Sequence, residues 1–356
     1  MIRVVSRAGQ RAMSTLIAAN VEPDQTVTAQ SDPEFPGLGF TYRFRDGQAE
    51  PLTARDIPAA LAEPGGWIWI HLSLTATHAR DWIAHTAPLP DRARAILLSD
   101  DDHQLLEPIE GGVAGVFADL LREFAGETRE LGRLHFALTD TLVVSGRRAA
   151  LGAIQRTLDA LGKGKKFPDA IALLEEIVSH FADAVAMVAQ ELSDTLNAIE
   201  ESLIDDASAG ARAKLGPTRR TAVRIHRQLS TLRLLFRRWS VPSEISAPTR
   251  IGVTSGRLAQ RLDSLDQEIV AIQERARLLQ DEIAAKVAAE TNRHLFVLTV
   301  LTAFLLPPTL ISGIFGMNVS DLPFTKDGGG FIWAMGLIIL SSVLVYAVMR
   351  ALRITR

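Results

Sequence analysis

One asparagine near the C-terminus has the residue type and the setting for ion chemistry. Asn318 closes a Gly-Met-Asn sequence at 316–318, near the end of the first of two long stretches without a charged side chain, 295–320 and 328–349. Its amide oxygen is a neutral acceptor, and a symmetric ring of such oxygens can hold a hydrated cation by its water shell. Mg²⁺ suits such a ring because it gives up its waters reluctantly. The structural alternative is that Asn318 only caps the end of a helix.

The stretch before Asn318 repeats its side chains in a regular order. On a helix, residues three or four apart share one side, and six do so here: Thr291, Leu295, Leu298, Thr302, Leu306 and Thr309. A threonine hydroxyl in an apolar helix can bond the carbonyl four residues earlier, so no single threonine needs a function. Three threonines in line with Asn318 are equally compatible with a stripe that lines a pore and with a purely structural stripe.

Two membrane-spanning helices must position these residues. Each uncharged stretch exceeds the about 20 apolar residues that cross a ~30 Å hydrocarbon core. We expect the first span at about 295–317, an outer loop at 319–330, the second span at 331–350 and a tail at 351–356. The positive-inside rule places both termini in the cytoplasm, in a multi-pass protein of the cytoplasmic (inner) membrane. The basic residues behind this topology are Lys286, Arg293, Arg350, Arg353 and Arg356.

A long helix leads into the first span. Apolar residues alternate four and three apart over more than three heptads, as in a coiled coil: Leu258, Leu262, Leu265, Ile269, Ile272, Ala276, Leu279 and Ile283. No helix breaker separates this seam from the membrane, so we expect one stalk helix over 250–318. At ~1.5 Å per residue it is roughly 95 Å long. Its seam needs partners in water, and copies of the same helix around a symmetry axis are the simplest.

The chain before the stalk has a sharp charge asymmetry over 166–246. Ten acidic and no basic side chains lie from 169 to 206, and nine basic and no acidic ones from 212 to 238. Apolar residues continue through both at helical spacing, which predicts two antiparallel helices. We favour charges that face one another between these helices over an acidic helix that concentrates cations near a pore. Four tip carboxylates are left without an evident partner: Glu200, Glu201, Asp205 and Asp206.

Mixed strand and helix signals predict a cytoplasmic α/β domain over 31–165. Helices are expected at 77–86 and 91–98, with Asp91 as an N-cap. Residues 1–30 are expected to be a disordered tail. Short apolar runs bounded by turn residues favour strands at 40–45, 66–72, 115–120, 134–138 and 141–144.

Composition excludes several classes of protein. The net charge of −3 and the pI near 6.3 give no sign of nucleic-acid binding. The absence of cysteine excludes disulfides and thiolate metal sites. No nucleophile–base constellation or phosphate-binding loop is evident, so we expect neither an enzyme nor a covalent cofactor.

Together these features resemble the CorA-type family of metal ion transporters, over about residues 37–356. The resemblance implies a funnel-shaped homopentamer whose first membrane helix lines the pore. It implies a selectivity filter at Gly316, Met317 and Asn318, and a regulatory cation site between subunits at Asp281. The positions that it places along the pore below the filter are Thr309, Leu306, Leu298 and Leu295.

Three segments are similar to the ZntB-like branch, which is associated with zinc transport: 65–72, 87–90 and 304–316. After the asparagine, magnesium channels of the family typically carry Met-Pro-Glu-Leu, whereas this chain has Val-Ser-Asp-Leu-Pro-Phe at 319–324. Asp321 adds an acidic group at the expected pore mouth. Metal contacts are thus expected at Asn318 through a hydrated ion, at Asp281 and at Asp321.

The sequence therefore predicts divalent cation transport, with Zn²⁺ favoured and Ni²⁺, Co²⁺ and Cd²⁺ as further substrates. One alternative is a Mg²⁺ (Co²⁺) channel of the same fold, gated by intracellular cation. A second is a membrane-anchored coiled-coil scaffold. Expected partners are copies of the chain, the lipid membrane and the cation, with protons as candidates through Asp321 or His294; nucleic acid is not expected.

Overall fold

The computed structural model describes residues 34–63, 65–101, 103–123, 126–204, 208–240, 249–317 and 329–351. The chain divides into two compact units. The first unit comprises Met1–Ala198 and Gly216–Arg275, and the second comprises Ile199–Leu215 and Ala276–Arg356. The tail expected at 1–30 lies outside the described residues.

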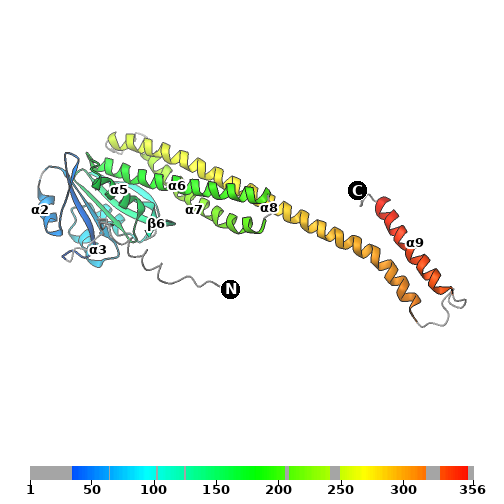
Figure 1. Cartoon of the computed structure of the whole chain (residues 1–356). Helices are drawn as coiled ribbons and strands as arrows, with labels where there is room; N and C mark the ends of the chain where they lie inside the picture. The colour runs from blue at the N-terminus through cyan, green and yellow to red at the C-terminus, as the bar shows by residue number, and fades with distance from the viewer. Residues whose placement is uncertain are drawn as a thin grey trace, which may run out of the picture. The chain divides into compact units, whose positions relative to one another are not determined.

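The first unit is built on a sheet that has seven strands within the described residues (Figure 1). Its order is β2-β1-β3-β7-β6-β5-β4, and neighbours are antiparallel except β3 and β7, which run parallel. The strands are β1 (Leu38–Arg45), β2 (Gln48–Pro51), β3 (Trp67–Ser73), β4 (Leu105–Ile109), β5 (Gly112–Glu123), β6 (Gly126–Thr139) and β7 (Leu142–Arg147).

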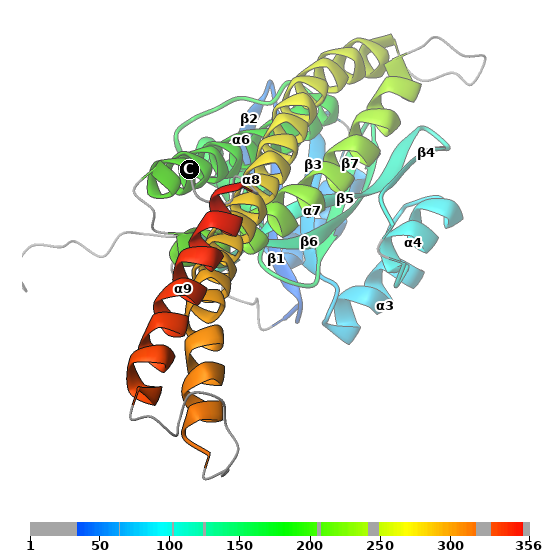
Figure 2. The same cartoon turned by 90° about the vertical axis from the view of Figure 1, so that its right-hand side faces the viewer.

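One face of the sheet packs on short helices. A 3₁₀ turn (Ala54–Asp56) leads into α2 (Ile57–Ala62), and α3 (Thr77–His85) and α4 (Asp91–Leu98) lie together beside the sheet (Figure 2). Alternate residues of β3, such as Ile68 and Ile70, join Ile83 and Ile96 in this core. Burying each such side chain contributes about 1.5–3 kcal/mol.

The opposite face of the sheet is aromatic. Trp67 stacks on Phe44 with ring centroids 3.8 Å apart, and Phe117 contacts Phe236 of α7 (Ser208–Ser240) at 5.4 Å. The buried carboxylate of Asp119 accepts a hydrogen bond of 2.9 Å from the first turn of α5 (Gly152–Gly162). Because helices cover both faces, β3 is apolar at nearly every position.

Helices α6 (Ala170–Ile204), α7 and α8 (Thr249–Phe315) run side by side in the first unit (Figures 1 and 2). Within the described residues, ion pairs join both α6 and α7 to α8, which the sequence did not predict. On the α6 side, arginines of α8 pair with acidic residues: Arg257 with Glu175 and Arg261 with Asp183. On the α7 side, aspartates of α8 pair with basic residues: Asp263 with Arg233 and Asp266 with His226.

The apolar seam of α8 is buried within the single chain. In the first unit Leu258, Leu262 and Ile269 are 3%, 0% and 0% exposed, and in the second unit Leu279 and Ile283 are each 4% exposed. The expectation that the seam needs copies of the helix was therefore wrong, because α6 and α7 already cover it in the first unit. Heptad spacing shows that a face is buried but does not show which helix covers it.

The predicted strands and helices of the sheet domain are confirmed at β1, β3, β5, β6, β7, α3 and α4. Asp91 is the first residue of α4 and not its N-cap, which is Pro90. Strands β2 and β4, each with a proline, and helices α2 and α5 were not predicted. At the tip of α6, Glu200 has a partner, contrary to the prediction, whereas Asp205 and Asp206 lie outside the described residues.

Candidate functional site

Among the residues that the structure describes, two helical stretches are long and apolar enough to cross a membrane: the end of α8 and the whole of α9 (Gly330–Ala351). The apolar windows of both are unburied in the chain. Leu298 is 59% and Ile332 is 75% exposed. The 22 residues of α9 span about 33 Å, close to the ~30 Å of a hydrocarbon core. Contiguous apolar surface of this extent indicates a lipid environment.

The predicted stripe on α8 presents its side chains outward. Leu295, Leu298 and Leu306 are 55%, 59% and 60% exposed in the single chain. Helix α8 continues through Pro307 and Pro308, so the stripe is carried on one helix as far as Phe315. Among the described residues, nothing buries these leucines in a way that would explain their alignment.

The threonines of the stripe all bond back to their own helix. Thr291, Thr302 and Thr309 donate to the carbonyls four residues earlier at 2.8, 2.8 and 2.7 Å. Thr299, which lies off the stripe, makes the same bond at 2.8 Å. Each hydroxyl proton is therefore used within α8, and only the oxygen lone pairs remain to face a bound water.

The end of α8 carries the beginning of the Gly-Met-Asn sequence. The N–H of Gly316 donates to the carbonyl of Ser312 at 2.9 Å, and the N–H of Met317 to that of Ile314 at 3.3 Å. A Cβ on Gly316 would stand 3.0 Å from the Ser312 oxygen, so this residue allows a tight last turn. The Met317 side chain is 57% exposed. Asn318 and Asp321 lie outside the described residues.

Asp281 lies on the exposed side of α8, between the buried seam residues Leu279 and Ile283. No group of three or more His, Asp or Glu side chains suited to a metal ion occurs among the described residues. The part of the chain that the structure describes therefore does not complete a three-ligand site at Asp281. Nearby, Lys286 donates from Nζ to the carbonyl of Leu203, which ties α8 to the C-terminal end of α6.

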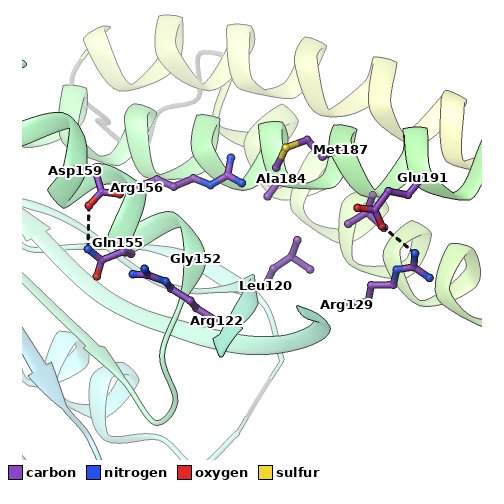
Figure 3. A pocket seen from close by; sticks show the side chains of 11 residues that line it. Leu120, Arg122, Arg129, Gly152, Gln155, Arg156, Asp159, Ala184, Met187 and Glu191 are labelled. Atoms are coloured by element: carbon purple, nitrogen blue, oxygen red, sulfur yellow. Dashed lines mark hydrogen bonds and ion pairs between the residues drawn. The ribbon is translucent and has the colours of Figure 1, made fainter. Parts of the chain in front are cut away.

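The sheet unit contains an open cavity of about 440 Å³ between β5, β6, α5 and α6 (Figure 3). Arg129 and Glu191 form an ion pair of 2.9 Å across it, and Gln155 donates to Asp159 at 3.0 Å. These charged groups are partnered inside the chain, so the lining does not by itself select a ligand. The sequence did not predict this cavity, because its residues come from four separate elements.

His71 is buried in a polar network inside the sheet unit. Arg147 Nε donates to His71 Nε2 at 3.0 Å, so the ring proton is on Nδ1 and points to Ser145 Oγ at 2.8 Å. Trp69 Nε1 donates to the same Ser145 oxygen at 2.8 Å. Burial, with a smaller contribution from the positive charge of Arg147, lowers the pKa of His71 to about 3. The ring is thus neutral at physiological pH, and its role is to join β3 to β7.

The family model of the CorA-like Mg²⁺ transporter protein matches residues 64–351, well over half of the chain. The chain therefore belongs to this family of divalent metal ion transporters. The family consists of transporters and not of enzymes, in agreement with the sequence prediction.

Individual relatives agree with this assignment. The zinc transport protein ZntB of Yersinia enterocolitica is 25% identical over 291 residues, which are 80% of this chain and 86% of that protein. The structure of the full-length CmaX protein covers 89% of this chain and 98% of its own, with a TM-score of 0.76 at 22% identity. The complete CorA magnesium transporter of Methanocaldococcus jannaschii covers 87% and 97%, with a TM-score of 0.71 at 17% identity.

These likenesses establish the fold. An α/β sheet domain is followed by a long helix with an apolar end and by a second apolar helix at the C-terminal end, as the sequence predicted.

Proposed function

We propose that the chain transports Zn²⁺ across the cytoplasmic membrane through a pore lined by the membrane part of α8. The observation that carries the proposal is the stripe on that helix. Its leucines are more than half exposed and its threonines are aligned with them, and the stripe leads directly to Gly316. The filter at Gly316, Met317 and Asn318 and the acidic mouth at Asp321 belong to this proposal.

The chemistry of the stripe favours an ion that keeps its waters. Since the threonine protons are bonded to α8 itself, the hydroxyl oxygens of Thr302 and Thr309 can only accept hydrogen bonds. The waters around a divalent cation point their hydrogens outward, so accepting oxygens and the Asn318 amide oxygen suit them. The leucines between these oxygens make narrow apolar collars, which exclude ions when they are dry.

A single α8 cannot enclose a pore, so the proposal requires a ring of copies, which we take to be a funnel-shaped homopentamer. The same ring would complete a regulatory cation site at Asp281. The described residues of one chain bring no group of three or more candidate ligands together there, and divalent cations that prefer oxygen ligands take about six of them. Neighbouring subunits and waters would supply the rest.

Zn²⁺ is proposed over Mg²⁺ on two grounds. Curated relatives at 24–25% identity carry the name zinc transport protein, and the segment after Asn318 lacks the Met-Pro-Glu-Leu of magnesium channels. The second candidate, a Mg²⁺ channel gated by intracellular cation, is favoured by the Gly-Met-Asn sequence and by the fold shared with a CorA magnesium transporter.

Uptake into proteoliposomes separates these candidates. Purified chain is reconstituted, and initial uptake of Zn²⁺, Mg²⁺, Ni²⁺, Co²⁺ and Cd²⁺ is measured with and without a pH gradient. We expect Zn²⁺ to enter faster than Mg²⁺, and an effect of the gradient if protons couple. Strong Mg²⁺ uptake that falls as internal Mg²⁺ rises would instead support the magnesium channel. Absence of uptake for all five ions would support a scaffold.

A further inference from the structure

The cavity between β5, β6, α5 and α6 has one positive charge in excess among its described lining residues (Figure 3). Glu191 is paired with Arg129 at 2.9 Å. Asp159 accepts a hydrogen bond from Gln155 at 3.0 Å. These partnered groups select no ligand, so any selection comes from the rest of the lining. The charged side chains that line the cavity are three arginines and two carboxylates: Arg122, Arg129, Arg156, Asp159 and Glu191.

Arg122 supplies a cationic group without a partner. Its backbone N–H donates to the carbonyl of Ala150 at 3.0 Å, while its side chain is exposed. Within the residues that the structure describes, its guanidinium group makes no hydrogen bond and no ion pair. A guanidinium group offers five donors in a planar fork, which matches the geometry of a carboxylate or a phosphate group. Arg122 is therefore suited to hold an oxyanion in the cavity.

Another part of the lining is apolar. Leu120, Ala184 and Val188 are buried side chains at the cavity wall. Met187 of α6 also lines the cavity and is about half exposed, and its flexible thioether can adapt to the shape of a bound molecule. Apolar walls with a few polar groups that fix orientation are typical of small-molecule sites. This lining suits a molecule that has an apolar body and one anionic group.

The size and the support of the cavity also fit a small ligand. Its volume of about 440 Å³ is within the roughly 300–1,000 Å³ of ligand pockets. The buried carboxylate of Asp119 accepts a hydrogen bond of 2.9 Å from the N–H of Ala153, which holds the first turn of α5 against β5. The ion pair of Arg129 with Glu191 joins β6 to α6. The walls are thus held in place without a ligand, which lowers the cost of binding.

We propose that this cavity binds a small organic anion, with its carboxylate or phosphate group on Arg122 and its apolar body against Leu120 and Met187. The site is separate from the proposed pore, because every described lining residue belongs to the first unit. The bound molecule contacts the sheet through β5 and the helical bundle through α6. Because it binds only the folded chain, it also stabilises the first unit.

Calorimetric titration of the full-length protein in detergent tests the site. The probes are benzoate, phenyl phosphate, inorganic phosphate and the neutral benzyl alcohol, which also reports partition into the detergent. The variants are Arg122→Gln and Met187→Ala. The control is Arg227→Gln, an exposed arginine of α7 that does not line the cavity and has no partner within the described chain. Thermal unfolding checks the fold of each variant.

We expect benzoate, phenyl phosphate or both to bind the wild type, and the tighter probe identifies the preferred oxyanion. Arg122→Gln should raise the dissociation constant at least about tenfold, because a charge-assisted hydrogen bond is lost. Met187→Ala should raise it about threefold for the organic anions and leave inorganic phosphate unchanged, because only the apolar contact is removed. Arg227→Gln should bind as the wild type does.

Four outcomes overturn the proposal. The first is that neither organic anion binds, and the second is that Arg122→Gln binds them as tightly as the wild type. If benzyl alcohol binds as tightly as benzoate, the cavity does not select an anion. If inorganic phosphate binds as tightly as both organic anions, the apolar wall contributes nothing and the ligand is not organic. None of these results bears on cation uptake, which is measured separately.

Discussion

The two ends of α8 carry apolar stripes of similar spacing, but only the stripe in the first unit is buried within the chain. Leu262, in the bundle of the first unit, is 0% exposed, whereas Leu298, in the apolar end of the same helix, is 59% exposed. The first leucine is covered by helices of its own chain. The second leucine is exposed in the single chain, toward the surroundings of the membrane helix. A three-and-four repeat therefore identifies a face, and the neighbouring elements decide what that face contacts.

A matched pair of truncations on α8 sharpens this comparison with the largest expected effect. Leu262→Ala removes a fully buried side chain and leaves a cavity, so we expect a loss of about 2–5 kcal/mol in unfolding free energy. Leu298→Ala removes an exposed side chain and should change it by less than about 0.5 kcal/mol. Urea unfolding in detergent, followed by tryptophan fluorescence of the first unit, measures both. Equal losses would show that the membrane end is also packed within the chain.

The sheet unit should lose stability in acid through His71. Its pKa is lowered to about 3 in the folded chain, against about 6.5 when unfolded. Between these values the unfolded chain binds the extra proton, so stability is present above pH 6.5 and falls as the pH drops toward 3. The slope is about 1.4 kcal/mol per pH unit. Thermal unfolding of the wild type and of His71→Gln from pH 7 to pH 4.5 tests this.

The His71→Gln variant serves as its own control for other titrating groups. Glutamine is neutral over this range, so the variant should keep only the slope that the other groups cause. An identical pH slope in both proteins would mean that His71 is not held neutral by burial beside Arg147.

A pair of threonine substitutions gives the smallest effect and separates the stripe from the rest of the same helix. Thr302 and Thr299 make the same backbone bond at 2.8 Å, but only Thr302 lies on the stripe. Valine removes the hydroxyl at nearly constant shape. We expect Thr302→Val to reduce cation uptake several-fold, since a water acceptor is lost from the pore, and Thr299→Val to leave it unchanged. Equal rates for both would make the threonines purely structural.

Local patterns in the sequence were sufficient for much of the fold. The short apolar run of β3 and the heptads in α8 each record burial, and both elements formed where they were expected. Strands β2 and β4 were missed because Pro51 and Pro108 argue against a strand, although the edge positions of β2 and β4 in the sheet tolerate proline.

Partner choice was the part that the sequence could not predict. The charge runs of α6 and α7 suggested that they pair with each other, but they gave no sign that Arg257 and Asp263 of α8 also pair with these helices, through contacts between distant parts of the chain. The buried acid at Asp266 was hidden for the same reason, because its partner His226 is on another helix. Of the candidate site, the stripe and Asp281 were found as exposed positions of α8, and their roles stay predictions.

The central claim is that Asn318 forms the selectivity filter of a cation path through the membrane. The most direct test is Zn²⁺ uptake into proteoliposomes that contain either the wild type or Asn318→Ala, at equal protein content and with the oligomer checked by light scattering. Loss of the amide oxygen should abolish uptake while assembly and the thermal unfolding of the sheet unit stay intact. Unchanged uptake by Asn318→Ala would contradict the account, because the Gly-Met-Asn sequence would then not be the selectivity filter.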